Sequence, residues 1–457
     1  MSLEGYGDQA VKLLDSACAS LFDEVELERD DGVVVRGIVL PRPQYGDPDI
    51  LVLKLPNGYN VGVDARRVKS IRRVGRVEPS RGALPPPPSL KPGLPRVHFI
   101  GTGGTIASRI DYVSGAVYPY FTAEEIYSMV PELESVALLS AETLFSVFSE
   151  DLTPRHWSMI AERVAQVFER EEPAGIIVAH GTDTMGYTAA ALAFALRRLP
   201  GPVVLVGAQR SSDRPSSDSA TNVLAAAITA LKAPFAESVV VMHAGLDDTA
   251  FYVHRGVRVR KMHTSRRDAF RSVNAVPLAK VELPSRELKV FARRFLQRSR
   301  EGVLLENGFE EKVALVKFYP GMSGELLDFL VDKGYRGVVI EGTGLGHVSE
   351  RLLPSVRRAV EEGVVVVVAS QCLWGRVNMN VYRRGVELLK AGALPAEDML
   401  PETAFVKLSW VLARTSDVRE AASLFLTNVA YEMGERSEEW YYPPLNYFER
   451  YVGGGGQ

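Results

Sequence analysis

The feature that most constrains the fold is an alternation of short apolar runs and amphipathic helical segments after Arg96. VHFI, GIIVAH, VVLVGA and SVVVMHAG are the apolar runs, and segments such as TAEEIYSMVPEL and TAAALAFALRRL separate them. Runs this short have the length of a strand, and a repeat of strand and helix builds a mostly parallel sheet with helices on its faces. The sequence therefore predicts an α/β fold from this point on.

A second series of the same kind follows, with the runs KVALVKFYP, GVVIEG and VVVVVASQ and helical segments between them. The charged stretch over 284–311 loses the pattern, so we expect it to connect two domains. After the second series, PETAFVKLSWVLARTSDVREAASLFLTN has the pattern of one or two closing helices. The predicted units are a first α/β domain at 96–283, a second at 312–440, and a tail at 441–457.

A proline-rich stretch separates a small N-terminal module from the α/β part. Seven prolines lie between Pro79 and Pro95, and such a stretch favours the polyproline II conformation of a semi-rigid spacer. We therefore expect a module over 1–78 and a linker over 79–95. Within the module, Asp30-Asp31-Gly32 and Asn57-Gly58 interrupt alternating apolar residues, as tight hairpin turns do. The pattern predicts a helix over Asp8–Phe22 and then a small SH3-like β-barrel.

The barrel is predicted to end in a basic cluster, RRVKSIRR, over residues 66–73. One interpretation is a contact with RNA or a partner protein. The other is a solvated strand edge whose charges prevent pairing with other chains. The formal net charge of the whole chain is -3, so total charge offers no argument for nucleic-acid binding.

Cysteine content and hydropathy restrict the class of protein. Cys18 and Cys372 are the only cysteines; they support neither a disulfide framework nor a zinc knuckle, and they fit a reducing cytosol. No apolar run approaches the roughly 20 residues of a membrane-crossing helix, and MSLEGYGDQA lacks the features of a signal peptide. No His, Cys and Asp cluster has metal-ligand spacing. We therefore expect a cytoplasmic protein with no membrane contact and no metal.

Three predicted strands end in unusually polar loops: GTGGT at 101–105, HGTDTM at 180–185 and GAQRSSD at 207–213. In α/β sheets, ligands bind at the carboxyl ends of the strands. Glycine there allows a close backbone approach, and a following helix N-terminus favours an anion or oxyanion. Any one such loop is more simply an ordinary connection with an N-capping Thr or Asp. Three together predict a ligand site at this edge of the sheet.

Phosphate binding is the competing interpretation of GTGGT. The chain contains no G-x-x-x-x-G-K-[ST], and GTGGT lacks the G-x-G-x-x-G spacing, so a nucleotide fold is the weaker hypothesis. The threonines favour acyl transfer instead, because a neighbouring base can activate a Thr hydroxyl as a nucleophile. A lysine oriented by a carboxylate can be that base. Taken alone, Lys261 is more simply a surface cation.

Two of the loops resemble a known family. TGGTIA at 102–107 and HGTDTM at 180–185 are similar to the two signature motifs of the bacterial-type L-asparaginases, in the same order and each after a strand. The similarity runs from about Arg96 to near Glu435. It implies an asparaginase-like core of two α/β domains and amide hydrolysis by a threonine nucleophile.

The resemblance assigns the chemistry to a few residues. Thr105 corresponds to the threonine usually assigned as the nucleophile, and Lys261 corresponds to the family's lysine. Thr182-Asp183 corresponds to the threonine and aspartate that form a relay with that lysine. The family also has a tyrosine beside the nucleophile. Neither Tyr112 nor Tyr118 aligns with it, so the residue that activates Thr105 is not assigned.

The resemblance also implies a substrate pocket. Ser149 and Glu150 correspond to a Ser-Gln pair that holds the α-carboxylate and α-amine of the substrate, with Glu in place of Gln. Gly104 and Gly181 are further substrate-binding candidates, since backbone N–H groups near the motif glycines would meet the oxyanion.

The N-terminal module points to a more specific family. A β-module and proline linker ahead of an asparaginase-like core are similar to the D-subunit family of archaeal glutamyl-tRNA(Gln) amidotransferases. This implies hydrolysis of glutamine and transfer of ammonia to the amidotransferase's E subunit, which uses ATP and Mg to activate the glutamate on tRNA(Gln). No cofactor is implied for this chain, and a homodimer within a heterotetramer is expected. Two alternatives stay open: a stand-alone L-asparaginase or glutaminase, and a non-catalytic amino-acid-binding module.

Overall fold

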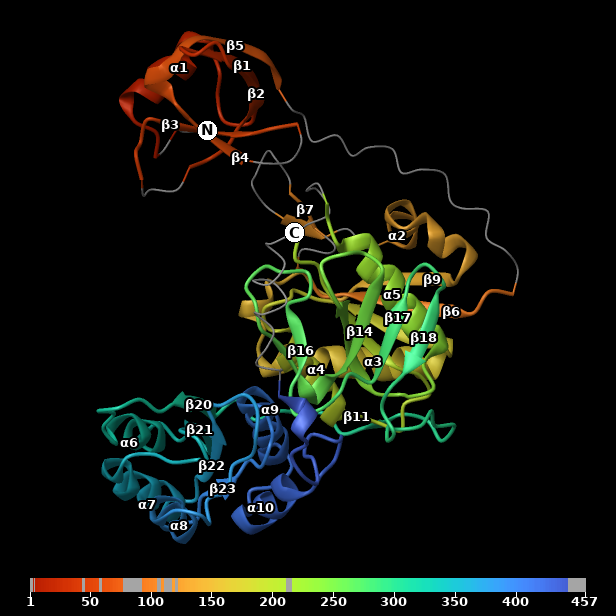
Figure 1. Cartoon of the computed structure of the whole chain (residues 1–457), viewed down its shortest axis with the longest axis vertical. Helices are drawn as coiled ribbons and strands as arrows, with labels where there is room; N and C mark the ends of the chain where they lie inside the picture. The colour runs from red at the N-terminus through yellow and green to blue at the C-terminus, as the bar shows by residue number, and fades with distance from the viewer. Residues whose placement is uncertain are drawn as a thin grey trace, which may run out of the picture.

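The computed structural model describes residues 3, 5–42, 46–56, 60–76, 93–104, 122–210 and 216–442, and the backbone of 108–110 and 117–119. Figure 1 shows a small β-module and two α/β domains that pack against each other. Among the residues that the structure describes, no helix combines the length and the apolar character needed to cross a membrane.

The N-terminal module is a five-stranded antiparallel sheet with the order β4-β3-β2-β1-β5. It consists of α1 (Asp8–Ser16), β1 (Asp23–Arg29), β2 (Val34–Val39), β3 (Ile50–Lys54), β4 (Asn60–Asp64) and β5 (Val68–Arg76). Alternate side chains of β1 are buried, which places Val25 and Leu27 in a core with Leu14 of α1. The predicted small β-module is confirmed.

The helix of this module is shorter than predicted. It ends at Ser16 and not at Phe22, because Cys18 and Phe22 take positive φ angles of 49° and 70° that a helix does not allow. The turn after β1 is confirmed, with Gly32 at a φ of 78°. Asn57-Gly58 and most of the predicted linker lie outside the described residues.

The basic cluster lies at the edge of this sheet and is paired with carboxylates. N–O distances between 2.6 and 3.0 Å join Arg66 to Asp47 and Asp64, Arg67 to Asp30, Arg72 to Glu26, and Arg73 to Asp23. Arginines engaged in this way have fewer donors left for phosphate groups. The pairs therefore favour the interpretation of a charged, solvated strand edge.

The first α/β domain contains an eight-stranded sheet with the order β18-β17-β14-β13-β12-β10-β6-β9. The strands from β9 to β13 in this order are parallel, and β14, β17 and β18 are antiparallel. Their bounds are β6 (Arg96–Gly101), β9 (Leu138–Thr143), β10 (Gly175–Ala179), β12 (Val203–Val206), β13 (Ser238–His243), β14 (Ala250–Arg255), β17 (Ala279–Glu282) and β18 (Glu287–Val290).

Helices cover both faces of this sheet. On one face lie α2 (Ala123–Met129) and α5 (Ser219–Lys232). On the other face lie α3 (Pro154–Glu171) and α4 (Met185–Ala195). Two short hairpins, β7 (Ser108–Ile110) with β8 (Val117–Pro119) and β15 (Val259–Lys261) with β16 (Phe270–Ser272), lie outside the main sheet.

The order of the strands creates a crevice between β6 and β10. These two strands are neighbours, but the chain continues from β6 to β9 on one side and from β10 to β12 on the other. In open α/β sheets, ligands bind at such a reversal, outside the carboxyl ends of the strands. The loops that leave β6 and β10 carry the second motif and the described start of the first, residues 102–104, so these residues lie at the crevice.

The second α/β domain contains a parallel sheet with the order β20-β21-β22-β23. Its strands are β20 (Val313–Lys317), β21 (Gly337–Gly342), β22 (Val365–Ser370) and β23 (Leu394–Pro395). Its helices are α6 (Glu325–Asp332), α7 (Leu353–Glu361), α8 (Arg383–Lys390), α9 (Pro401–Leu412) and α10 (Val418–Leu426). The last two confirm the predicted closing helices.

The stretch predicted to connect the domains contains strands. β18 pairs with β17 as the edge of the first sheet, and β19 (Leu304–Leu305) pairs with β11 (Leu196–Arg197). The sequence predicted that the strand–helix alternation is lost over 284–311 and that the stretch connects the domains, and it did not single out these strands. Edge strands carry exposed charges, and Glu287 and Lys289 on β18 obscure its apolar positions in the sequence.

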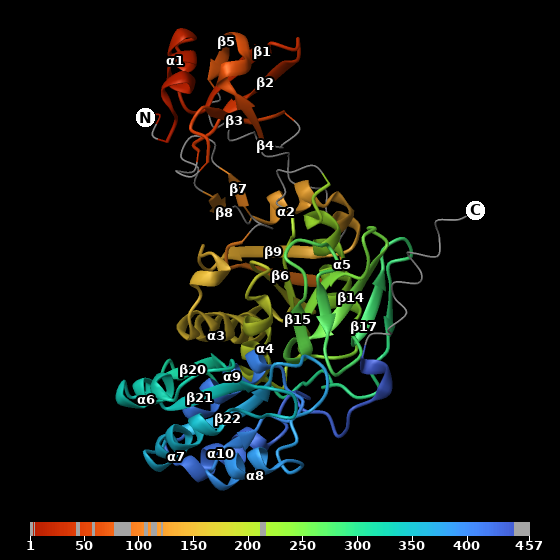
Figure 2. The same ribbon diagram turned by 60° about the vertical axis from the view of Figure 1, so that its left-hand side comes forward.

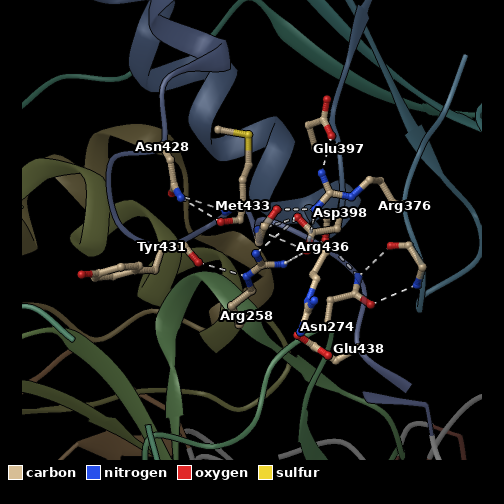
Figure 3. A network of polar contacts seen from close by, with 12 residues as sticks. Arg258, Asn274, Arg376, Glu397, Asp398, Asn428, Tyr431, Met433, Arg436 and Glu438 are labelled. Atoms are coloured by element: carbon tan, nitrogen blue, oxygen red, sulfur yellow. Dashed lines mark hydrogen bonds and ion pairs between the residues drawn. The ribbon is translucent and has the colours of Figure 1, made fainter. Parts of the chain in front are cut away.

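Two of the contacts between the α/β domains show how they are joined. Helix α4 is apolar on all sides, as expected of a helix buried on every face, and it lies against α9 (Figure 2). Phe194 of α4 packs on Trp410 of α9. Figure 3 shows the second contact, in which Arg258 of the first domain meets Asp398 of the second. Their side chains are buried, with 3.1 Å between Nη1 and Oδ2. Asn274 donates to the Asp398 carbonyl from the same side.

Candidate active site

The loops that follow β6, β10 and β12 meet around a cavity of about 210 Å³. It is lined by Gly104, Phe148, Ser149, Glu150, Gly181, Thr182, Asp183, Ala208, Gln209, Lys261 and Thr264. Of the predicted site residues, all but Thr105 are in this lining. Thr105 and Tyr112 lie outside the described residues, and of Tyr118 only the backbone is described.

Lys261 joins the two polar residues of the second motif. Its Nζ donates to Thr182 Oγ1 at 2.9 Å and to Asp183 Oδ1 at 2.8 Å. The lysine ends β15, which pairs it with the buried Phe270 of β16. Its side chain is 13% exposed, whereas that of Asp183 is 69% exposed. Lys261 is therefore a largely enclosed group held by two partners, and the interpretation as a surface cation is wrong.

Two glycines allow the loops to approach one another. Gly104 has a φ of +85°, and a Cβ at this position would lie 2.5 Å from the Gly181 nitrogen. A Cβ at Gly181 would lie 2.7 Å from the Cβ of Ser149. Atoms do not pack this closely, so a side chain at either glycine would push the loops apart. Glycine is needed at both positions to bring three separate loops to one cavity.

Ser149 and Glu150 lie on a single 3-10 turn over Ser149–Asp151. The buried Ser149 donates from Oγ to Glu150 Oε2 at 3.3 Å, and its carbonyl accepts from Thr184 Oγ1 at 2.6 Å. The second bond ties this turn to the start of α4. With Asp183, Glu150 places a second carboxylate at the cavity, and opposite charges attract, so the pair suits a cationic group such as an ammonium.

The buried side chain of His180 supports the second motif. The buried ring has Nδ1 at 2.7 Å from the Gly181 carbonyl and Nε2 at 2.8 Å from Thr188 Oγ1. Desolvation by burial lowers the pKa of His180 to about 4, so the ring is neutral near pH 7. A neutral ring can donate from Nδ1 to the carbonyl and accept the Thr188 hydroxyl at Nε2. These contacts give His180 a structural role in the loop.

The third loop contributes residues that the sequence did not single out. Gly207 packs on the second motif, since a Cβ there would lie 2.7 Å from Thr182 Cγ2. Ala208 and Gln209 then line the cavity. The sequence signal for these residues was their place in a polar loop after a third parallel strand. Phe148 and Thr264 were also missed, and their only signal was closeness in sequence to predicted site residues.

No group of three or more His, Cys, Asp and Glu side chains in the described part of the chain could hold a metal ion. The side chains that line the cavity offer hydroxyls, one amine, one carboxamide and two carboxylates, beside backbone groups. Such a set suits acyl transfer, in which a hydroxyl attacks a carbonyl carbon and a nearby amine moves the proton.

Comparison with known proteins identifies the family. The models described as GatD N-terminal domain, Asparaginase, N-terminal, and Glutaminase/Asparaginase C-terminal domain match residues 19–74, 96–294 and 312–425. A Thermofilum pendens protein, named as the D subunit of glutamyl-tRNA(Gln) amidotransferase, is 55% identical over 96% of this chain and 99% of its own length. The chain belongs to the D-subunit family of glutamyl-tRNA(Gln) amidotransferases. A Methanopyrus kandleri protein of the same name is 52% identical over 94% of this chain and 95% of its own length.

Solved structures confirm the predicted asparaginase-like fold. The thermostable L-asparaginase from Thermococcus kodakarensis has a TM-score of 0.67 and 30% identity, covering 74% of this chain and 99% of that one. L-asparaginase I from Vibrio cholerae has a TM-score of 0.66 and 27% identity, covering 75% and 99%. The asparaginases thus match about three quarters of the chain, whereas the D subunits match nearly all of it.

Proposed function

We propose that this chain hydrolyses glutamine as the D subunit of a glutamyl-tRNA(Gln) amidotransferase and supplies ammonia to a partner protein. The observation that carries the proposal is the contact of Lys261 with Thr182 and Asp183 in the cavity. The proteins named for this amidotransferase are related to the chain over nearly its whole length.

Charge sets the orientation that we propose for glutamine. Its α-ammonium lies between the carboxylates of Asp183 and Glu150, and its α-carboxylate lies near the hydroxyl of Ser149. The side-chain amide then extends toward Gly104 and Thr182, at the loops that leave β6 and β10. Thr105, the nucleophile implied by the resemblance, directly follows Gly104 in the chain.

The proposed reaction has two steps. The hydroxyl oxygen of Thr105 attacks the amide carbon and gives up its proton to the relay, the C–N bond breaks, and the nitrogen takes that proton and leaves as ammonia. Water then hydrolyses the acyl ester to release glutamate and restore the hydroxyl. Lys261, whose Nζ lies 2.9 Å from Thr182 Oγ1, is the base of the proposed relay, and Asp183 orients the amine.

Negative charge on the carbonyl oxygen needs donors in the transition state. The second motif directly precedes α4, whose N-terminus carries a partial positive charge. Backbone N–H groups near Gly104 and Gly181 complete the proposed oxyanion site. Because glycine packing fixes these loops, the donors need little rearrangement during the reaction.

The partner in this proposal is the amidotransferase's E subunit, which activates the glutamate on tRNA(Gln) with ATP and Mg, so this chain needs no cofactor of its own. We propose a homodimer of this chain within a heterotetramer that acts in the cytoplasm. The family match to the N-terminal module at 19–74 supports the amidotransferase over a stand-alone asparaginase. The enclosed Lys261 opposes a non-catalytic binding module, because binding alone does not require such a relay.

The test is a hydrolysis assay of the chain alone, with the E subunit, and with the E subunit plus Glu-tRNA(Gln). We expect glutamine hydrolysis to depend on the partner and the charged tRNA, and free ammonium to replace glutamine in amide formation. Fast hydrolysis of asparagine by the chain alone, without stimulation, would instead identify a stand-alone asparaginase.

A further inference from the structure

We propose that Gln209 binds the side-chain carboxamide of the substrate by donating a hydrogen bond from Nε2 to its carbonyl oxygen. The proposal rests on glutamine hydrolysis as proposed above and assigns a further substrate-binding residue to that site. Gln209 lines the same cavity as Thr182 and Lys261.

The amide nitrogen of Gln209 is buried without a partner. Its accessible area is below 1 Å², and it has no hydrogen-bond partner among the described residues. A buried donor that has lost its water and gained no acceptor costs about 1–3 kcal/mol. An oxygen atom of a ligand in the cavity would supply the acceptor and remove this cost.

The loop that carries Gln209 is fixed by a buried carboxylate. The backbone N–H groups of Gln209 and Arg210 donate to Asp218 at 3.0 and 2.9 Å. Asn222 of α5 donates to the Gly207 carbonyl and to Asp218, both at 2.9 Å. Asp218 and Asn222 are fully buried. The backbone is therefore ordered before a ligand arrives, which reduces the entropy lost on binding.

The network continues to the segment that follows Lys261. His243 reaches Asn222 Oδ1 at 2.8 Å and Asp248 Oδ1 at 2.9 Å. Arg267 donates to Asp248 at 3.0 Å and to the Ser216 carbonyl at 2.7 Å. The loop of Gln209 and the segment after Lys261 are thus held against one another, so the positions of the two side chains are set together.

The neighbours of Gln209 indicate which part of the substrate it meets. An NH₂ group donates and cannot stabilise an ammonium, which leaves that end to Asp183 and Glu150. Gly207, two residues before Gln209, packs on the methyl group of Thr182. The loop therefore borders the threonine that Lys261 contacts, where the carboxamide is proposed to react. The carbonyl oxygen at that end gains negative charge in the transition state, so a donor there accelerates the reaction.

The test uses Gln209→Met, which keeps the length of the side chain and removes its donors. In the complete complex with Glu-tRNA(Gln), we expect kcat/KM for glutamine to fall about 10²-fold, mainly in kcat, as when one oxyanion donor is removed. Gln166→Met is the matched control, because Gln166 lies on α3 and its side-chain hydrogen bonds among the described residues join it to Arg163 and Glu162 in its own helix. Amide formation from free ammonium is expected to be unchanged in both variants, which verifies folding.

A second substrate separates the possible roles of Gln209. Glutamine and the γ-methyl ester of glutamate share the carbonyl oxygen, but only glutamine has the NH₂ group. The proposal expects Gln209→Met to lose about the same factor with both. A loss confined to glutamine, a rise in KM with kcat unchanged, or no effect overturns it. A wild-type complex that does not hydrolyse glutamine overturns the proposed function itself, whatever the variant does.

Discussion

The two α/β domains use the same strand–helix alternation, yet only the first gathers polar groups in the cavity described above. In the first sheet the strand order reverses between β6 and β10, whereas β20 to β23 follow one another in chain order. Without a reversal, neighbouring loops turn to the same side and leave no crevice. Strand order, and not the composition of the strands, thus decides which domain carries the candidate site.

Two glutamines at strand ends make the difference concrete. Gln371 directly follows β22, and its Nε2 donates to the Glu341 carbonyl at 2.9 Å and to the Phe318 carbonyl. Gln209 follows β12, and its Nε2 has no acceptor among the described residues. The side-chain amide of Gln371 thus bonds to acceptors within the second domain. The amide of Gln209 keeps a donor without an acceptor among the described residues, which is the donor that we assign to the substrate.

The largest expected effect is on the lysine of the first domain. Lys261→Met removes the amine shared by Thr182 and Asp183, and we expect glutamine hydrolysis to fall about 10²- to 10⁴-fold, the contribution of a general base. Lys317→Met is the control at a strand end of the second domain, where the lysine is exposed and pairs with Glu341 at 3.4 Å. The measurement is the steady-state rate of glutamine hydrolysis. Equal losses in both variants would contradict a special role for Lys261.

The next effect concerns the junction of the two domains. Asp398→Ala leaves Arg258 buried without its carboxylate, and breaking a buried pair costs about 3–5 kcal/mol. Chemical denaturation is expected to show that loss in the free energy of unfolding. Glu435→Ala, which breaks an exposed pair with Arg294, is expected to cost less than about 1 kcal/mol. Similar losses would mean that the buried pair is not what holds the domains.

A lower pH is expected to reduce the stability of the first domain against unfolding. Burial lowers the pKa of His180 to about 4 and that of His254 to about 3, against about 6.5 in an unfolded chain. Between pH 6.5 and 4 the unfolded state binds protons that the folded state does not. Stability is therefore full above pH 6.5 and falls by about 1.4 kcal/mol per pH unit for each histidine as the pH drops.

Urea unfolding at several pH values checks this prediction. His180→Gln is expected to reduce the pH dependence by the share of one histidine. The matched control is His263→Gln, because His263 is exposed on a loop of the same domain. An unchanged slope in the His180 variant would contradict the account.

The smallest expected effect is the loss of stability in a Gln371 variant, which can be compared directly with a Gln209 variant. Gln371→Met leaves the Phe318 and Glu341 carbonyl groups with one donor fewer, and a hydrogen bond of this kind contributes about 1 kcal/mol. We expect that loss of stability without a change in catalytic rate. Gln209→Met is expected to do the opposite, with a lower rate and no loss of stability. The same outcome at both positions would remove the distinction between them.

Much of the fold and part of the site followed from local patterns. Buried strands with apolar side chains on both faces are visible in any window of the sequence, as is the glycine-rich composition of the two motifs. Edge strand β18 was not visible, because charged residues mask its pairing. The early end of α1 at Ser16 was missed as well, since the positive φ angles of Cys18 and Phe22 depend on how the chain enters β1.

The sequence by itself determined the α/β class, the family and the residue types of the reaction. Only the tertiary structure decided that Lys261, 79 residues after Thr182, lies within hydrogen-bond distance of it, and that the amide of Gln209 is buried without a partner among the described residues. The physical reason is the separation along the chain of the residues that interact. Strands, helices and turns follow from contacts between near neighbours in the chain, whereas burial and long-range hydrogen bonds depend on which strands lie side by side.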